Sequence, residues 1–322
     1  MSSEAKSPTF GELPARLAGR IASVIRGKDE VIRDAVICML SEGHLLIQDV
    51  PGLGKTTLAR ALAASTQVAM SRIQFTPDLL PSDVTGVAVF DPKTTEFEFR
   101  PGPIFHNIVL ADEINRASPK TQSALLEVME EGTVTYDGFR YTLPKPFMVI
   151  ATQNPIDMEG TYTLPEAQLD RFLMRISMDY PSVDAEIEIL RSERDGATVT
   201  TTTPAVTETE LLAMIDYVKK IQVAPILDRY IVDVVAATRT DPAARLGASP
   251  RASLALLRAA RAAAACEGRP FVTPEDIKRL AFPVMAHRII MRPEAEMSGQ
   301  SANDVVQRAL DAVPVPRRSE DS

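Results

Sequence analysis

The 322-residue sequence has no tryptophan, only two cysteines and three histidines, and few aromatic residues, 5% in all. Cys38 and Cys266 are far apart, and each falls in an apolar, helix-like pattern. That pattern is typical of small buried side chains in a reducing compartment, not of a disulfide. The histidines, His44, His106 and His287, do not have the spacing of metal ligands. The sequence therefore argues against a disulfide-stabilised protein and against a histidine- or cysteine-built metal site.

Long hydrophobic runs and concentrated positive charge are also missing. No apolar run approaches the roughly 18 residues needed to cross a membrane. The polar N-terminal stretch lacks the apolar segment of a secretory signal, so we expect a cytoplasmic protein with no membrane span. The net charge is -8, and the acidic residues are spread along the chain. Because a duplex-binding protein usually carries a basic stripe, charge argues against nucleic acid as the main partner, although a ring could still gather its few cations in a pore.

The hydrophobic pattern predicts an α/β fold with a covered parallel sheet. Hydrophobic residues make up 45% of the chain, and its length suits one large and one smaller domain. Continuous apolar strands separated by helical patterns are typical of a parallel sheet that helices cover on both faces. Strands are expected near 45–48, 70–75, 108–111 and 147–154. Helices are expected at about 10–25, 29–42, 56–65 and 119–131, the last of them between a capping Ser118 and Gly132.

Two hairpins and a second domain complete the predicted organisation. Residues 85–105 alternate like two strands, and residues 133–144 do so around Asp137-Gly138. The threonine-rich stretch 195–207 has no helical face, which indicates a domain boundary. Helices follow at about 208–221, 225–239, 250–266 and 273–286. We expect an α/β core at 1–195 with two hairpin inserts, a linker at 196–207, a small all-helical domain at 208–314 and a flexible tail at 315–322.

The stretch LLIQDVPGLGKTTLARALA, from Leu45 to Ala63, reads as a buried strand, a glycine-punctuated turn and a helix. A helix N-terminus presents unpaired N–H groups and a partial positive charge, so we expect an anion, a phosphate, as its ligand. The turn follows the phosphate-loop pattern G-x-x-x-x-G-K-[ST], with aspartate in place of the first glycine. The candidate nucleotide-binding residues are Asp49, Val50, Pro51, Gly52, Leu53, Gly54, Lys55, Thr56 and Thr57.

Each residue type in this loop has an expected role. Asp49 can start the turn through its own side chain, and its carboxylate must then point away from the phosphates. Gly52 and Gly54 allow a close backbone approach. Lys55 would reach the β- and γ-phosphates, and the Thr56 hydroxyl would ligate Mg²⁺. The alternative is a glycine-rich turn after a core strand, without a ligand.

Polar residues end the next two core strands. Asp112 and Glu113 follow four apolar residues, at the edge where doubly wound sheets hold their ligands. Asp112 can bind the magnesium shell, which leaves Glu113 free to deprotonate an attacking water. Asn154 ends a neighbouring strand, where a neutral amide could hold the water or a γ-phosphate oxygen. The alternatives are two solvated acids at a strand end and, for Asn154 before a proline, a turn former.

Two arginines lie in the second half of the chain. Arg251 would sit in the first turn of a helix, where a cation opposes the helix dipole by roughly 0.3 to 1 kcal/mol and needs an anionic partner. We expect either simple solvation or a γ-phosphate reached by folding the helical domain over the nucleotide. Arg171 follows Asp170, and it forms either a local or cross-core salt bridge or an arginine finger presented to the nucleotide of an adjacent subunit.

Five stretches, in this order, resemble the AAA+ ATPases and within them the MoxR family, over about residues 24–260. They are DVPGLGKTTLARALA, FTPDLLPSDVTG, FRPGPIFHNIVLADEINRASPKTQSALLEVMEEG, ATQNPIDMEGTYTLPEAQLDRF and SPRAS. The resemblance implies a P-loop core followed by a lid domain. It makes Gly52, Gly54, Lys55 and Thr56 Walker A, Asp112 and Glu113 Walker B, Asn154 sensor 1, Arg171 the arginine finger and Arg251 sensor 2.

The resemblance also implies a function. MoxR-like proteins hydrolyse ATP with Mg²⁺, form rings that are commonly hexamers, and remodel, mature or activate other proteins. Their hairpin inserts face the ring's pore or axial surface, and their companions often carry a von Willebrand factor A domain, which this chain lacks. A nucleic-acid motor or helicase loader is the alternative, because such proteins share the inserts. A binding switch without turnover is a third reading, which Glu113 disfavours.

Overall fold

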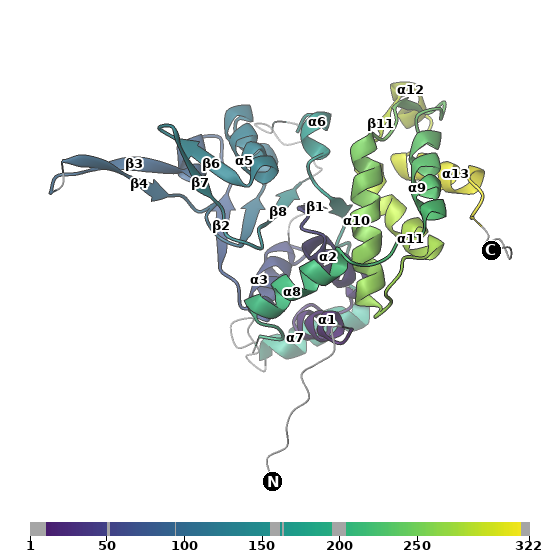
Figure 1. Ribbon diagram of the computed structural model, residues 1–322, viewed down its shortest axis with the longest axis horizontal. Coiled ribbons are helices and arrows are strands. Elements are labelled where there is room, and N and C mark those ends of the chain that lie inside the picture. Colours follow the sequence, from purple (N-terminus) through teal and green to yellow (C-terminus); the bar gives the residue numbers. More distant parts are fainter. Residues whose placement is uncertain are drawn as a thin grey trace, which may run out of the picture.

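A five-stranded parallel sheet lies at the centre of the computed structural model, which describes residues 11–49, 52–93, 95–154, 162, 164–194 and 204–316. The strand order is β2-β5-β8-β1-β9, and every neighbouring pair is parallel. Figure 1 labels β1, β2 and β8 of this sheet. The strands are β1 (Leu45–Gln48), β2 (Met70–Gln74), β5 (Ile108–Asp112), β8 (Met148–Gln153) and β9 (Met174–Ile176). Among the described residues, no helix is long and apolar enough to cross a membrane.

The inner strands β1, β5 and β8 are buried along nearly their whole length. Successive side chains of a strand point to opposite sides of the sheet, so both faces of these strands are covered. In β5, Ile108 and Leu110 join one hydrophobic cluster, whereas Val109 and Ala111 join another. The first cluster contains α1 (Leu13–Ala22), α2 (Asp29–Leu40) and α3 (Lys55–Thr66). The second contains α4 (Pro81–Thr85) and α5 (Pro119–Glu131). The predicted parallel sheet with helices on both faces is therefore confirmed.

Local signals set the ends of α5 as expected. Ser118 is the N-cap residue, and its hydroxyl accepts a hydrogen bond from the Thr121 N–H at 3.4 Å. Pro119 is the first helical residue, and Gly132 ends the helix in the left-handed conformation with φ of 64°. These caps satisfy backbone groups that the helix itself leaves unpaired.

Both predicted hairpins are present and project together from one side of the core (Figure 1). The first pairs β3 (Gly86–Asp91) with β4 (Glu96–Pro101), and the second pairs β6 (Thr133–Tyr136) with β7 (Phe139–Thr142). Phe99 of the first hairpin stacks on Tyr141 of the second, with ring centroids 4.3 Å apart. This contact ties the two inserts to each other.

The second domain is helical apart from one short antiparallel pair, which the sequence analysis did not anticipate. Its elements are α8 (Glu208–Val218), α9 (Pro225–Ala237), β10 (Ala244–Leu246), α10 (Pro250–Cys266), α11 (Pro274–Met285), the 3-10 turn η3 (Ala286–Arg288), β11 (Ile290–Met291), α12 (Pro293–Met297) and α13 (Ala302–Ala312). Buried side chains of this domain belong to the same cluster as α1–α3, so core and lid share packing. Most of the predicted linker and tail lies outside the described residues.

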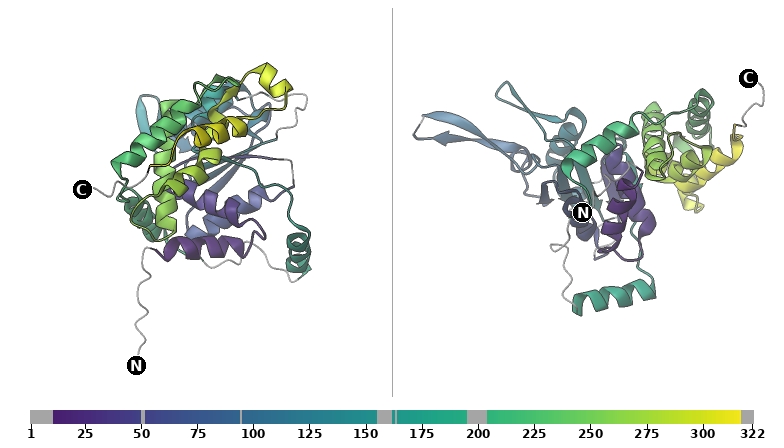
Figure 2. Two further views of the ribbon diagram at one scale, coloured as in Figure 1. Left: turned by 90° about the vertical axis from the view of Figure 1, so that its right-hand side faces the viewer. Right: turned by 60° about the horizontal axis from the view of Figure 1, so that its bottom comes forward.

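Several further elements were not predicted individually. Among them are β9, α4, α12, α13, the 3-10 turn η1 (Ile114–Arg116), α6 (Glu166–Leu169) and α7 (Val183–Arg194). The last of these lies apart from the main body (Figure 2). This helix contacts the core at two places. Ala185 packs against Gly27, so closely that a side chain at position 27 would collide with it. Glu188 forms an ion pair with Arg26 at 3.9 Å.

A buried ion pair fastens the lid to the core. The Arg288 side chain of η3 is only 4% exposed, and its Nε lies 2.7 Å from Asp170 Oδ1. Its two terminal nitrogens donate to backbone carbonyls, among them those of Phe172 at 2.7 Å and Leu173 at 3.1 Å. Burial lowers the pKa of the guanidinium, and the hydrogen bond to Asp170 opposes that shift. The charge is tolerated because the guanidinium is paired and well supplied with acceptors.

We predict that Asp170→Asn lowers the free energy of unfolding by about 3–5 kcal/mol, because it leaves the buried charge of Arg288 without its counter-ion. Chemical denaturation would measure the loss. Asp216→Asn is the matched control, since Asp216 forms an exposed pair with Lys219 at 3.5 Å, and such pairs contribute less than about 1 kcal/mol. Equal losses in the two variants would contradict a structural role for the buried pair.

Candidate functional site

The predicted phosphate loop connects β1 to α3 in the described structure, apart from Val50 and Pro51, which lie outside the described residues. Gly52 and Gly54 have φ of 88° and 86°, in the left-handed region that side-chain-bearing residues rarely adopt. Gly54 is the N-cap residue of α3. The N–H groups of the first turn of α3 thus point toward the space that a phosphate would occupy.

Asp49 turns its carboxylate away from the start of α3. Its Oδ2 accepts hydrogen bonds from the backbone N–H of Met178 at 2.6 Å and of Asp179 at 2.8 Å, and from the Ser177 hydroxyl at 3.2 Å. Asp49 therefore holds the segment after β9 against the loop. The Lys55 ammonium donates to the Asp49 carbonyl oxygen at 2.7 Å.

The Lys55 ammonium lies in a partly buried position among carboxylates. Burial lowers its pKa, and the charges of Asp49, Asp112 and Glu113 oppose that shift. Because those charges support the protonated form, Lys55 can offer a cation to an anionic ligand.

The Thr152 hydroxyl of β8 links the two carboxylate residues at the end of β5. It donates to Asp112 Oδ1 at 2.6 Å and accepts from the Glu113 N–H at 2.8 Å. Glu113 has φ of 56°, a left-handed conformation that is uncommon for glutamate and that ends the strand abruptly. The side chain of Thr152 is almost fully buried. It was missed by the sequence analysis, although a lone polar residue in the apolar run of β8 was a usable signal.

Strand β2 adds two polar side chains that the sequence analysis also missed. Arg72 places its Nη2 2.6 Å from Asp112 Oδ2, and Gln74 donates to Glu113 Oε2 at 3.3 Å. The same Glu113 oxygen lies 3.1 Å from Arg116 Nε. Both carboxylates are thus held by polar partners on neighbouring elements.

The candidate phosphate-binding residues and the carboxylates at the end of β5 line one cavity of about 320 Å³. Its described lining is Gly52, Gly54, Lys55, Thr56, Thr57, Asp112, Glu113, Thr152 and Asn154. The structure therefore brings together the described residues that the resemblance assigns to Walker A, Walker B and sensor 1. Thr56 and Asp112 contribute a hydroxyl and a carboxylate, which are the hard oxygen donors that Mg²⁺ prefers, so the residues present fit that ion.

The two candidate arginines lie elsewhere. Arg171 Nη2 is 2.9 Å from one carboxylate oxygen of Glu130, and Arg251 Nη2 pairs with the other. All three line a different cavity, of about 600 Å³, between α5 and α10. Neither arginine is among the described residues that line the phosphate cavity.

Of the two salt bridges expected for Arg171, with its neighbour Asp170 or with an acid across the core, the structure shows the second. Asp170 pairs with Arg288, whereas Arg171 reaches across to Glu130. The placement of Arg251 differs from the expectation that the lid brings it to the nucleotide of its own chain. The start of α10 is held at the core because the Ser249 hydroxyl donates to Asp170 Oδ2 at 3.2 Å.

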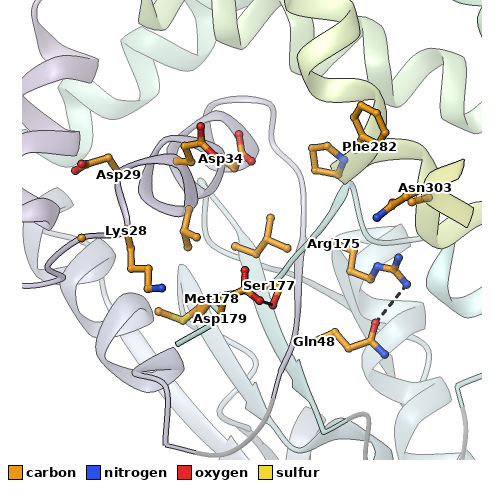
Figure 3. Close-up of a pocket in the computed structure, with 16 residues that line it drawn as sticks. Lys28, Asp29, Asp34, Gln48, Arg175, Ser177, Met178, Asp179, Phe282 and Asn303 are labelled. Carbon is orange, nitrogen blue, oxygen red and sulfur yellow. Dashed lines mark hydrogen bonds between the residues drawn. The ribbon is translucent and has the colours of Figure 1, made fainter. Parts of the chain in front are cut away.

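A larger cavity, of about 1010 Å³, lies beside the phosphate loop (Figure 3). Lys28 lines it from the N-cap of α2, Gln48 from the end of β1, and Phe282 from the lid. Met178 also lines it and approaches the loop, since its Cε would be 3.8 Å from a Cβ on Gly54. Space for a larger ligand group is thus available next to the phosphate position.

We predict that Thr152→Val lowers the free energy of unfolding by about 1–3 kcal/mol, because it leaves a buried N–H and a carboxylate oxygen without their partner. The ATP turnover that the resemblance implies should fall about tenfold, which corresponds to about 1.4 kcal/mol of lost transition-state stabilisation. Denaturation and steady-state kinetics would measure the two effects. Thr152→Ser keeps the hydroxyl and is the control; equal turnover in the valine and serine variants would contradict the bridging role.

Known protein families match both the α/β core and the helical domain of the chain. Residues 44–174 match the model of the ATPase family associated with various cellular activities, and residues 236–309 match that of the AAA lid domain. The uncharacterised protein YeaC of Bacillus subtilis is 49% identical, over 92% of both chains. The chaperone MoxR1 of Mycobacterium tuberculosis is 40% identical, over 92% of this chain and 81% of its own.

The fold has a close counterpart in a crystal structure. It is that of a proposed ATPase from Cytophaga hutchinsonii, with a TM-score of 0.90 and 37% identity over 96% of each chain. The identities to full-length relatives and the two family matches agree with the resemblance read from the five sequence stretches. The chain belongs to the MoxR family of AAA+ ATPases.

Proposed function

We propose that this chain is a magnesium-dependent ATPase that hydrolyses ATP to ADP and phosphate, assembles into a ring, commonly a hexamer, and remodels or activates partner proteins in the cytoplasm. The observation that carries the proposal is the separation of the cavities. Lys55, Asp112 and Glu113 line one of them, and Arg171 and Arg251 line another.

The phosphate cavity supports ATP hydrolysis within one subunit. The N-terminus of α3 and Lys55 would bind the phosphates, and Thr56 and Asp112 would hold Mg²⁺, which would neutralise phosphate charge. Glu113 would take a proton from the attacking water, and Asn154 would orient that water or a γ-phosphate oxygen. The larger cavity beside the loop, lined by Gln48 and Met178 among others, would hold the base and ribose.

The second cavity supports assembly. In phosphoryl transfer, an arginine supplied by a neighbouring subunit can stabilise the charge of the transition state. Arg171 and Arg251 share one carboxylate and are partly exposed. In a head-to-tail ring, the cavity with the arginines of one subunit would face the phosphate cavity of the next. Turnover would then depend on assembly.

The exposed hairpins favour a protein as the client. Phe97 and Phe139 at the two hairpins are 74% and 67% exposed, which suits contact with apolar groups of another polypeptide. The first hairpin, at 86–101, contains three acidic residues and two basic ones, so its net charge is 2 − 3 = -1. They are Asp91, Glu96 and Glu98 against Lys93 and Arg100. A separate protein with a von Willebrand factor A domain is a candidate partner.

A nucleic-acid motor is the second candidate, since related motors carry the same inserts. The acidic balance of the chain and of the first hairpin argues against it, because binding to phosphate backbones needs clustered Lys and Arg. Turnover that rises with single- or double-stranded nucleic acid, but not with a protein partner, would favour the motor.

We predict that Glu113→Gln still binds ATP with Mg²⁺ and assembles, but hydrolyses ATP at least about a hundredfold more slowly, because the general base is lost. Calorimetry with ATP and a phosphate-release assay would measure binding and turnover. Glu131→Gln, at an exposed position of α5, makes the same charge change as a control. Near wild-type turnover in Glu113→Gln would remove Glu113 from its assigned role.

Arg171→Ala should bind ATP yet lose turnover, because the pocket residues of its own chain stay in place while the transition-state charge is uncompensated. Mixing this variant with Glu113→Gln tests whether Arg171 acts between subunits. In randomly mixed rings, about a quarter of interfaces combine an intact pocket with an intact arginine, so activity should return. Hybrid rings that form but remain inactive would show that Arg171 does not act across an interface.

A further inference from the structure

Glu130 and Arg251 each occupy the unfavourable end of a helix. Glu130 lies in the last turn of α5, next to Glu131, and that turn contains no basic residue. Arg251 lies in the first turn of α10, which contains no acidic residue. The helix dipole disfavours an anion at a C-terminus and a cation at an N-terminus. Neither residue therefore stabilises the helix in which it lies. The ion pair between Glu130 and Arg251 offsets the unfavourable interaction of each charge with its own helix dipole.

Glu130 divides its carboxylate between two domains. Oε2 pairs with Arg171 at 2.9 Å, and Oε1 pairs with Arg251 of the lid. Arg171 also donates to the Leu126 carbonyl, one turn earlier on α5. The side chains of Arg171 and Arg251 are 28% and 52% exposed, so another anion can reach both guanidinium groups from solvent.

The cavity around this group is rich in arginine. Its described lining includes Arg171, Arg251, Arg258, Arg261 and Arg288 against the acids Glu42, Glu130 and Asp170. Asp170 is already paired with the buried Arg288. Glu42 pairs with Lys219 at 2.7 Å. Glu130 is therefore the carboxylate that holds the two partly exposed arginines, and the lining has more arginines than acids, so an incoming anion would meet positive charge.

We propose that Glu130 is a positioning residue: it holds Arg171 and Arg251 together in the unassembled subunit and yields them to the γ-phosphate of a nucleotide bound by the adjacent subunit. This inference rests on the proposed function, and it assigns a role to a residue outside the motifs of the nucleotide site. A terminal phosphate carries more negative charge than one carboxylate and offers three acceptor oxygens. It can therefore replace Glu130 at both arginines.

The exchange has a measurable consequence. Suppose that only subunits whose arginines have left Glu130 can contact the nucleotide of the neighbouring subunit. The apparent affinity for ATP is then the intrinsic affinity multiplied by the fraction of such subunits. If about one subunit in ten is released, removal of the competing carboxylate strengthens the apparent affinity about tenfold. The rate at saturation should not change, since Glu130 has left the arginines by then.

Glu130→Gln, compared with wild type and with Glu131→Gln, tests the proposal. The glutamine removes the charge at nearly constant volume, and the control removes a charge from the adjacent exposed residue of the same helix. ATP turnover is measured as a function of ATP at several protein concentrations. We expect KM for ATP in Glu130→Gln to fall about three- to tenfold, with kcat within about twofold of wild type, and Glu131→Gln to match wild type.

A second measurement does not depend on nucleotide. Amide hydrogen exchange in the first turn of α10 should be several times faster in nucleotide-free Glu130→Gln than in the control, because that turn has lost the ion pair of Arg251 with α5. Unchanged exchange there would overturn the holding role.

The kinetic outcomes also decide. An unchanged KM in Glu130→Gln, or a loss of kcat like that of Arg171→Ala, would overturn the exchange. If the wild-type protein itself does not turn over ATP, the proposed function fails and this inference fails with it. If wild type turns over ATP and the two glutamine variants behave alike, only the role of Glu130 is lost.

Discussion

Burial of both faces of the central sheet is the constraint on which the site depends. Strands covered on two sides cannot carry polar side chains along their length without an unpaired polar group in the core. Polar residues therefore gather where the parallel strands end, and all of them end at the same edge. Gln74 pairs in register with Asp112, and Gln48 with Gln153. The phosphate loop opens at this edge, so its cavity is surrounded by carboxylate, amide and hydroxyl groups.

The same edge explains why the carboxylates are so well held. A carboxylate at the border of a hydrophobic core needs hydrogen-bond partners. Asp112 has Thr152 and Arg72, and Glu113 has Gln74 and Arg116. The partners come from three different elements. Such support fixes the two side chains before any ligand arrives, which is the condition for a pre-organised site.

The contact between core and lid at Asp170 sets the position of Arg171 and Arg251. Asp170 binds both the buried Arg288 and the N-cap hydroxyl of Ser249. Arg171 follows Asp170, and Arg251 lies in the first turn of the helix that Ser249 caps. One carboxylate therefore brings the two arginines near each other. They meet at Glu130 and not at the phosphate cavity. The candidate phosphate-binding residues and the two arginines therefore line different cavities of one chain, which supports the proposal that turnover needs a neighbouring subunit.

The sequence by itself determined those features that depend on neighbouring residues. Gly54 ahead of Lys55, Ser118 and Gly132 around α5, and the turn at Asp137-Gly138 act through local backbone geometry, so their structures could be predicted. The alternation of apolar strands and helices likewise determined the covered parallel sheet. The order of the motifs along the chain was enough to indicate the MoxR family.

The tertiary structure decided the partners of the charged residues. Arg72 pairs with Asp112, forty residues further along the chain, and Glu130 pairs with Arg251 of the other domain. Asp170 pairs with Arg288 and not with its neighbour Arg171. Short elements such as β10 and β11 were also missed, because a strand of two or three residues leaves no periodic signal. Charged side chains can pair with any opposite charge that packing brings near. Their partners are therefore fixed by the distances that the folded chain creates, which no local pattern contains.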